Sequence, residues 1–114
     1  KVVRLHVPTG EEHEMIIDKG RNDVIFKLHV DAQGMHLIIA GNQGENWYVP
    51  IARSLKPRLM TMARGARIES VAWDREADES NTGVVMIGTS TGTICKACLV
   101  DGKEKYWKEI FSLR

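Results

Sequence analysis

The chain has 114 residues, enough for one modest domain, and its 43% apolar and 27% charged residues are ordinary for a soluble globular domain. Its formal net charge of +1 gives no argument for or against nucleic-acid binding. No apolar run approaches the ~18 residues of a membrane-spanning helix, and no signal-peptide pattern is found. Two cysteines three residues apart suit a reducing compartment, so a cytosolic domain is expected.

Residues 1–23 predict two strands of an incomplete unit. Residues 2–7 form a β-rich run that ends at a Pro-Thr-Gly turn at residues 8–10. Residues 14–18 are the next candidate strand, and a polar stretch closes it. Because the chain starts at Lys1 within strand-like sequence, we expect these to be the outer strands of a unit whose inner half lies upstream.

Residues 24–67 predict a four-stranded unit. From Val24 to Val30 apolar and polar side chains alternate, which is typical of a strand with one wetter face. Residues 31–34 predict a turn, because Asp and Gly occupy the positions that favour one. Residues 37–40 are apolar on both faces, as expected of a strand between neighbouring sheets. Two further strands are expected at residues 47–49 and 59–63.

Residues 68–114 predict a second unit of the same kind. Its strands are expected at residues 68–73, 84–89, 93–100 and 106–113. In the first of these strands, Val71 and Trp73 should share one face, and Ile68 and Ser70 should share the other. This alternation predicts a strand with small residues on one side.

A loop, a hairpin turn and the last strand complete the second unit. The loop at residues 75–82 is acidic and polar, so we expect it to be solvated and mobile. Asp101-Gly102 predicts a two-residue hairpin turn, since such turns need positive φ at both positions. Residues 106–113 also fit one helical face, and the repeat favours a strand there.

The two units repeat one pattern. Asp74 follows Asp31 by 43 residues, and Gly92 follows Gly44 by 48. A period of about 40–45 residues with several short strands is typical of a β-propeller blade. We therefore predict an all-β fold, a propeller fragment of about two and a half WD40-like blades, each blade having four antiparallel strands. An isolated fragment of this kind exposes strand edges, so we expect it to oligomerise.

Part of the second unit resembles a known family. The sequence reads ESVAW at residues 69–73, ESNTG at 79–83 and IGTSTGTI at 87–94. Together these resemble a segment of the vacuolar protein sorting-associated protein eighteen family, the Pep-three/deep-orange family. Residues 26–40 are similar to that family's preceding blade, so the resemblance covers residues 24–99. The chain lacks the Gly-His and Trp-Asp dipeptides of a strict WD40 blade, which fits the divergent propellers of this family.

The resemblance implies a segment of an N-terminal propeller in a core subunit of the HOPS and CORVET tethering complexes. Such a subunit is a non-enzymatic scaffold for protein–protein interactions in endosome-to-lysosome or vacuole trafficking and fusion. Its implied partners are other tethering subunits, with SNARE and Rab machinery reached through the complex. Its implied location is the cytosolic face of late endosome, lysosome or vacuole membranes. The family's zinc-binding RING domain has no counterpart in these residues.

The cysteines and histidines predict no chemistry. Cys95 and Cys98 lie three apart in a strand, where they point to opposite faces, and no other cysteine completes a zinc site. A buried-core role is favoured for them. The histidines are expected at the surface or at strand edges, and they are His6, His13, His29 and His36. No catalytic residue, cofactor, metal or nucleic-acid partner is predicted.

A basic stretch is the one candidate binding site. Residues 46–68 contain no acidic residue and carry five candidate contact residues, namely Arg53, Lys56, Arg58, Arg64 and Arg67. The favoured interpretation is a solvated outer strand with its loops. The alternative is contact with anionic lipid head groups or an acidic partner. Two functions thus stay open beside the tethering scaffold: a peripheral membrane or phosphoinositide-binding propeller, and an unrelated WD40-like interaction domain.

Overall fold

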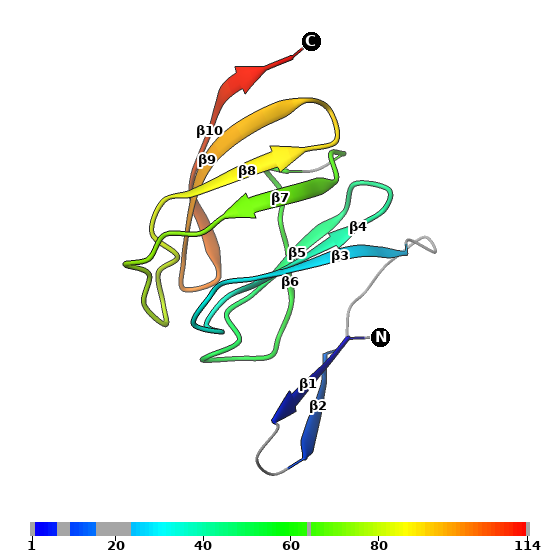
Figure 1. Ribbon diagram of the computed structural model, residues 1–114, viewed down its shortest axis with the longest axis vertical. Helices are drawn as coiled ribbons and strands as arrows, with labels where there is room; N and C mark the ends of the chain where they lie inside the picture. The colour runs from blue at the N-terminus through cyan, green and yellow to red at the C-terminus, as the bar shows by residue number, and fades with distance from the viewer. Residues whose placement is uncertain (1, 7–9, 16–23, 64, 114) are drawn as a thin grey trace.

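The structure is a computed structural model that describes residues 2–6, 10–15, 24–63 and 65–113 (Figure 1). Within these ranges every regular element is a β-strand, which confirms the predicted all-β class. The strands are β1 (Val2–His6), β2 (Glu11–Met15), β3 (Ile25–Val30), β4 (Leu37–Gly41), β5 (Asn46–Val49), β6 (Arg58–Leu59), β7 (Ile68–Ala72), β8 (Val85–Thr89), β9 (Thr93–Val100) and β10 (Lys103–Ser112).

The strands form antiparallel sheets in which each strand pairs with its neighbour in the chain. β1 pairs with β2, the first four-stranded sheet runs β3-β4-β5-β6, and the second runs β7-β8-β9-β10. This simple meander is the topology of a propeller blade. The blade boundaries predicted after residues 23 and 67 stay a prediction. The predicted hairpin turn between β9 and β10 is confirmed, since Asp101 and Gly102 have φ of 52° and 80°.

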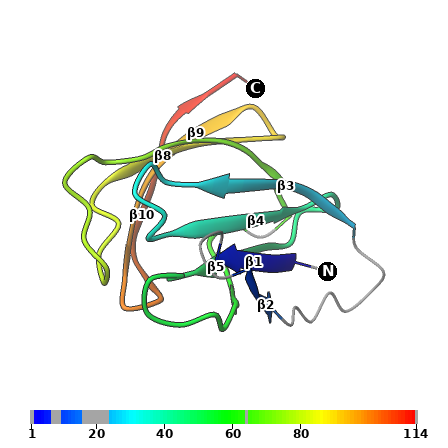
Figure 2. The same cartoon turned by 60° about the horizontal axis from the view of Figure 1, so that its bottom comes forward.

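The two four-stranded sheets share one hydrophobic core. Figure 2 shows the second sheet lying over the first. The core residues are Ile38, Ala40, Tyr48, Met60, Ala63, Ile68, Val85, Ile87, Ala97 and Leu99. On the other face of the first sheet, Leu37 and Ile39 belong to a second buried cluster. Both faces of β4 are therefore buried, as the sequence predicted.

Two bulges change which side chains are buried. In β7 the register shifts between Ile68 and Ser70, so Ile68 enters the shared core while Ser70 is exposed. The prediction that these two residues share a face is wrong for this reason. In β3 the register also shifts, between Ile25 and Lys27, and the face that the sequence predicted to be apolar is exposed to solvent. The apolar side chains at alternate positions of β3 are 43–51% exposed, whereas His29 is buried.

The fourth strand of the first sheet is shorter than predicted. β6 ends at Leu59, so the strand predicted at residues 59–63 is wrong beyond its first residue. Met60 and Ala63 instead turn into the shared core, because the chain crosses here from the first sheet to the second. The described residues 60–63 and 65–67, here called the crossover, therefore connect the two sheets.

A buried asparagine fixes the crossover. The Asn46 side chain donates from Nδ2 to the carbonyl oxygens of Ala63 and Ala66, at 3.2 and 2.8 Å. Its Oδ1 accepts a hydrogen bond from the N–H of Ile68, at 3.1 Å, where β7 begins. One fully buried amide thus bonds three backbone groups, and the Ala63 carbonyl also accepts from the N–H of Ala66.

Replacing this amide should destabilise the protein. Asn46→Ala removes the side-chain partner of the Ile68 N–H and of the Ala66 carbonyl, and one of two donors to the Ala63 carbonyl, so we expect a loss of about 3 kcal/mol in the free energy of unfolding. Urea unfolding followed by tryptophan fluorescence measures this loss. The matched control is Gln33→Ala, an exposed amide in the β3–β4 turn, which should change stability by less than about 0.5 kcal/mol. Equal effects of the two variants would contradict the assignment.

Candidate functional site

Loops from both four-stranded sheets meet along one edge of the molecule, here called the loop edge (left side of Figure 1). It carries the turns at residues 31–34 and 101–102, and the longer connections at residues 50–57 and 73–84. The opposite edge carries short turns after β4 and β8. Because long connections from two sheets come together there, side chains of both sheets can converge at the loop edge.

A buried histidine joins the two sheets at the loop edge. The Nε2–H of His36 donates to the carbonyl oxygen of Asp78 at 2.7 Å, and Nδ1 lies 2.7 Å from the Tyr48 hydroxyl. Since a carbonyl only accepts, Nε2 carries the hydrogen, and in the tautomer with its single hydrogen on Nε2 the Tyr48 hydroxyl donates to Nδ1. Burial raises the pKa of Tyr48, which keeps this donor protonated. The rings of Tyr48 and Trp73 also stack with the imidazole.

The β7–β8 connection is exposed at Arg75, Glu76, Asp78 and Glu79, as predicted for a solvated loop at residues 75–82, but its backbone is held by hydrogen bonds. Asp78 Oδ1 accepts from the N–H groups of Ser80 and of the next residue, at 3.0 and 2.9 Å, and these contacts lower the pKa of the Asp78 carboxyl. Thr82 is fully buried and exchanges two 3.0 Å hydrogen bonds with the Leu99 backbone. The polar residues of this loop therefore serve its own backbone and β9.

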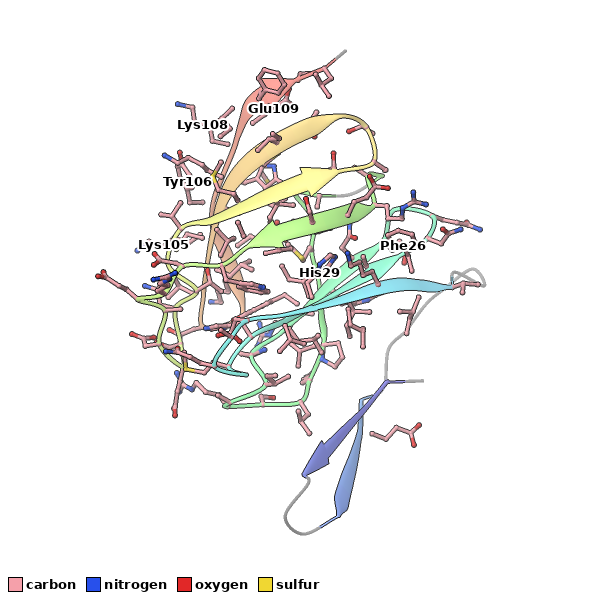
Figure 3. All side chains as sticks on the ribbon, viewed as in Figure 1. Phe26, His29, Lys105, Tyr106, Lys108 and Glu109 are labelled. Atoms are coloured by element: carbon pink, nitrogen blue, oxygen red, sulfur yellow. The ribbon has the colours of Figure 1, made fainter. Side chains whose placement is uncertain are left out.

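Two histidines are buried, so their predicted surface placement is wrong. His29 and His36 both face the shared core side of the first sheet. Figure 3 shows His29 projecting from β3 toward β7, where its Nε2 lies 3.1 Å from the carbonyl oxygen of Ile68. Burial lowers the pKa of His29, and the positive charge of Lys27 acts in the same direction.

The cysteines lie on opposite faces of β9, as predicted. Cys95 is buried, and burial raises the pKa of its thiol. Cys98 is half-buried, with its Sγ 3.4 Å from Asn81 Oδ1. Across the part of the chain that the structure describes, no three His, Cys, Asp or Glu side chains are grouped to hold a metal ion. Nor do the described residues include a helix suited to crossing a membrane.

A pocket of about 250 Å³ lies at the loop edge, with walls from both sheets, and is here called the basic pocket. Its lining residues are Pro50, Arg53, Ser54, Lys56, Arg58, Glu79, Ser80 and Asp101. An ion pair of 3.0 Å with Asp101 positions the Arg53 guanidinium. Arg58 lies against Gly102, where a Cβ atom would come 2.9 Å from its Nε. Three of the five predicted basic residues therefore meet in one place.

Arg67 does not join the basic pocket. It lies at the opposite edge, where its guanidinium carbon is 4.1 Å from the centroid of the Phe26 ring. Its Nη1 donates to Asn42 at 3.0 Å, and its Nη2 contacts Glu69 at 2.7 Å. Arg67 thus links the two sheets rather than presenting a free cation. Three other candidates lie outside the described residues, namely Arg64 and the side chains of His6 and His13.

A second pocket, of about 300 Å³, lies at the loop edge between the β3–β4 turn and the start of the β7–β8 connection. Trp73 and two carboxylates are among its lining residues. Asp31 Oδ1 accepts from the N–H groups of Met35 and His36, at 2.7 and 2.8 Å. Asp74 Oδ1 accepts from the N–H of Glu76 at 2.9 Å. Both carboxylates therefore cap the backbone of their own turns.

Sequence reasoning missed the polar side chains that hold the sheets together. Besides His36 and Asn46, Glu104 on β10 accepts from the N–H of Met62, at 2.8 Å, and from the residue before it, whereas Thr82 ties the β7–β8 connection to β9 within the second sheet. His36 and Asn46 each stand beside apolar runs in the sequence. A polar side chain in such a position must find a partner when buried, which is the signal that points to these residues.

Comparison with known proteins gives a family and several relatives. The family described as Pep3/Vps18/deep orange beta-propeller domain matches residues 1–114, which confirms the predicted resemblance and the propeller fold. "Vacuolar sorting protein 18" of Arabidopsis thaliana is 29% identical over 119 residues, covering 98% of this chain and 12% of the relative. "Vacuolar protein sorting-associated protein 18 homolog" of Danio rerio is 36% identical over 84 residues, covering 71% and 8%. The chain therefore spans about a tenth of these relatives or less.

Removing the histidine junction should loosen the β7–β8 connection. His36→Phe keeps an aromatic ring but leaves the Tyr48 hydroxyl without its partner and the Asp78 carbonyl with only the Asn81 N–H, so we expect a loss of about 2 kcal/mol in the free energy of unfolding. Hydrogen exchange should become faster at the amides of Thr82 and Leu99. Tyr48→Phe, which deletes one of the two bonds, should have the smaller effect. Unchanged exchange in His36→Phe would rule out this junction.

The stability of the protein should depend on the protonation of His29. Because the folded-state pKa of His29 is lowered, the unfolded chain binds the proton more readily. Its contribution is fully present above the unfolded pKa of about 6.5 and declines as pH falls below that value. Urea unfolding at pH 7.5 and pH 5.5 should show a smaller decline for His29→Gln than for the wild type. A decline of the same size in both would disprove the role of His29.

Proposed function

The chain belongs to the Pep3/Vps18/deep orange β-propeller family, and we propose that it forms part of a non-enzymatic scaffold in a membrane-tethering complex. Its relatives carry the names of vacuolar sorting proteins, which indicates a role in protein transport to the vacuole. The finer assignment is to a core subunit shared by the HOPS and CORVET complexes. The family match along residues 1–114 is the observation that carries this proposal.

The use of polar side chains supports a scaffold over an enzyme. His36, Asn46 and Thr82, the buried polar residues described above, all bond backbone groups within the fold. Such bonds make the relative position of the two sheets rigid. A rigid pair of sheets can present its connections to a neighbouring protein, and these connections lose little conformational entropy when that protein binds.

The partners in this proposal are other subunits of the tethering complex, with SNARE and Rab machinery reached through it. The location is the cytosolic face of late endosome, lysosome or vacuole membranes. Direct membrane binding by a basic surface has less support, because Arg67 is engaged by Glu69 and Arg53 by Asp101. An exposed pair of this kind leaves little net charge for anionic lipids.

Affinity capture from cells tests the scaffold function. The tagged protein, purified from a gentle lysate, should bring down tethering-complex subunits in reproducible stoichiometry. Asn46→Ala, which weakens the crossover, should lower this yield several-fold, whereas Gln33→Ala, at an exposed amide, should not. Capture of the wild type without any tethering subunit would refute the proposal. Flotation of the purified protein with anionic liposomes would then favour the membrane-binding alternative.

A further inference from the structure

The basic pocket brings together cations that the sequence only placed in one stretch. Arg53 and Lys56 come from the β5–β6 connection, and Arg58 comes from β6. The facing wall is formed by the second sheet, through Ser80 of the β7–β8 connection and Asp101 of the β9–β10 turn. The pocket is therefore a property of the packed pair of sheets.

The cations of the pocket are positioned in different ways. Asp101 holds Arg53, while Gly102 lets the Arg58 side chain lie close to the backbone of the second sheet. Within the described ranges, the side chains of Lys56 and Arg58 have no recorded carboxylate partner. These two are consequently the charges that remain for an incoming anion.

The shape and charge of the pocket select the class of anion. At about 250 Å³ it is smaller than the ~300–1,000 Å³ of a typical small-molecule site, and it can take the end of a side chain. Glu79 and Asp101 line the same pocket and repel a broad anionic surface. A flat membrane would meet these carboxylates, whereas a single acidic side chain can enter between them and the cations.

We propose that the basic pocket binds an acidic segment of a partner protein, whose carboxylate contacts Lys56 and Arg58. Arg53 acts as a positioning residue at the rim, and the guanidinium of Arg58 supplies a fork that fits a carboxylate. Because the pocket is open to solvent, binding weakens as salt is added. This inference does not depend on membership of a tethering complex, since it concerns a site and the chemistry that it recognises.

Fluorescence anisotropy with a labelled Glu-Ser repeat dodecapeptide tests the proposal on the purified protein at low salt. The double variant Lys56→Glu with Arg58→Glu should bind this peptide about tenfold more weakly than the wild type. The matched control, Lys105→Glu with Lys108→Glu, makes the same change in net charge on exposed residues of β10 (Figure 3). It should stay within about twofold of the wild type.

The outcomes separate a specific pocket from general charge attraction. Equal weakening in both double variants, or no binding of the peptide by the wild type, would overturn the proposal. So would flotation with phosphatidylserine vesicles that depends on Lys56 and Arg58 while peptide binding does not. Thermal unfolding monitored by circular dichroism checks the fold of each variant. If the glutamate variant fails to fold, Lys56→Gln with Arg58→Gln takes its place. This variant adds no repulsion and should still bind the peptide more weakly than the wild type.

Discussion

The architecture depends on one buried amide at the crossover. Asn46 bonds three backbone groups of a segment that leaves the first sheet and starts the second. Without these bonds the buried N–H of Ile68 and the part-buried carbonyl of Ala66 would lose their side-chain partner, which costs free energy. The position of β7, and with it the whole second sheet, follows from this constraint.

The packing of the two sheets also determines how the connections at the loop edge are positioned. Once the second sheet is placed, the Asp78 carbonyl comes within reach of His36, while Thr82 ties the same connection to β9 within the second sheet. The connection that carries Glu79 and Ser80 is then fixed beside the cations of the β5–β6 connection. The basic pocket thus depends on the packing of the two sheets, because residues of both sheets line it.

Local patterns predicted most of the strands and turns, but not the end of β6 at Leu59 or which polar groups become buried. The repeat anticipated a meander of four strands, and Asp101-Gly102 anticipated its hairpin. The bulge at Ile68 and the inward turn of Met60 depend on contacts between sheets, so no local pattern reveals them. For the same reason the stretch 53–67 predicted one basic surface, whereas the structure sends Arg67 to the opposite edge.

Several of the side chains that join the two sheets form hydrogen bonds with main-chain atoms of the facing segment rather than with its side chains. His29 reaches the carbonyl of Ile68, His36 that of Asp78, and Glu104 the N–H of Met62. Every residue type offers a carbonyl, and every type except proline offers an N–H. A substitution at a residue that contributes only its main chain therefore preserves the hydrogen bond, unless proline replaces a donor. The sequence on that side of the contact between the sheets can thus change during evolution.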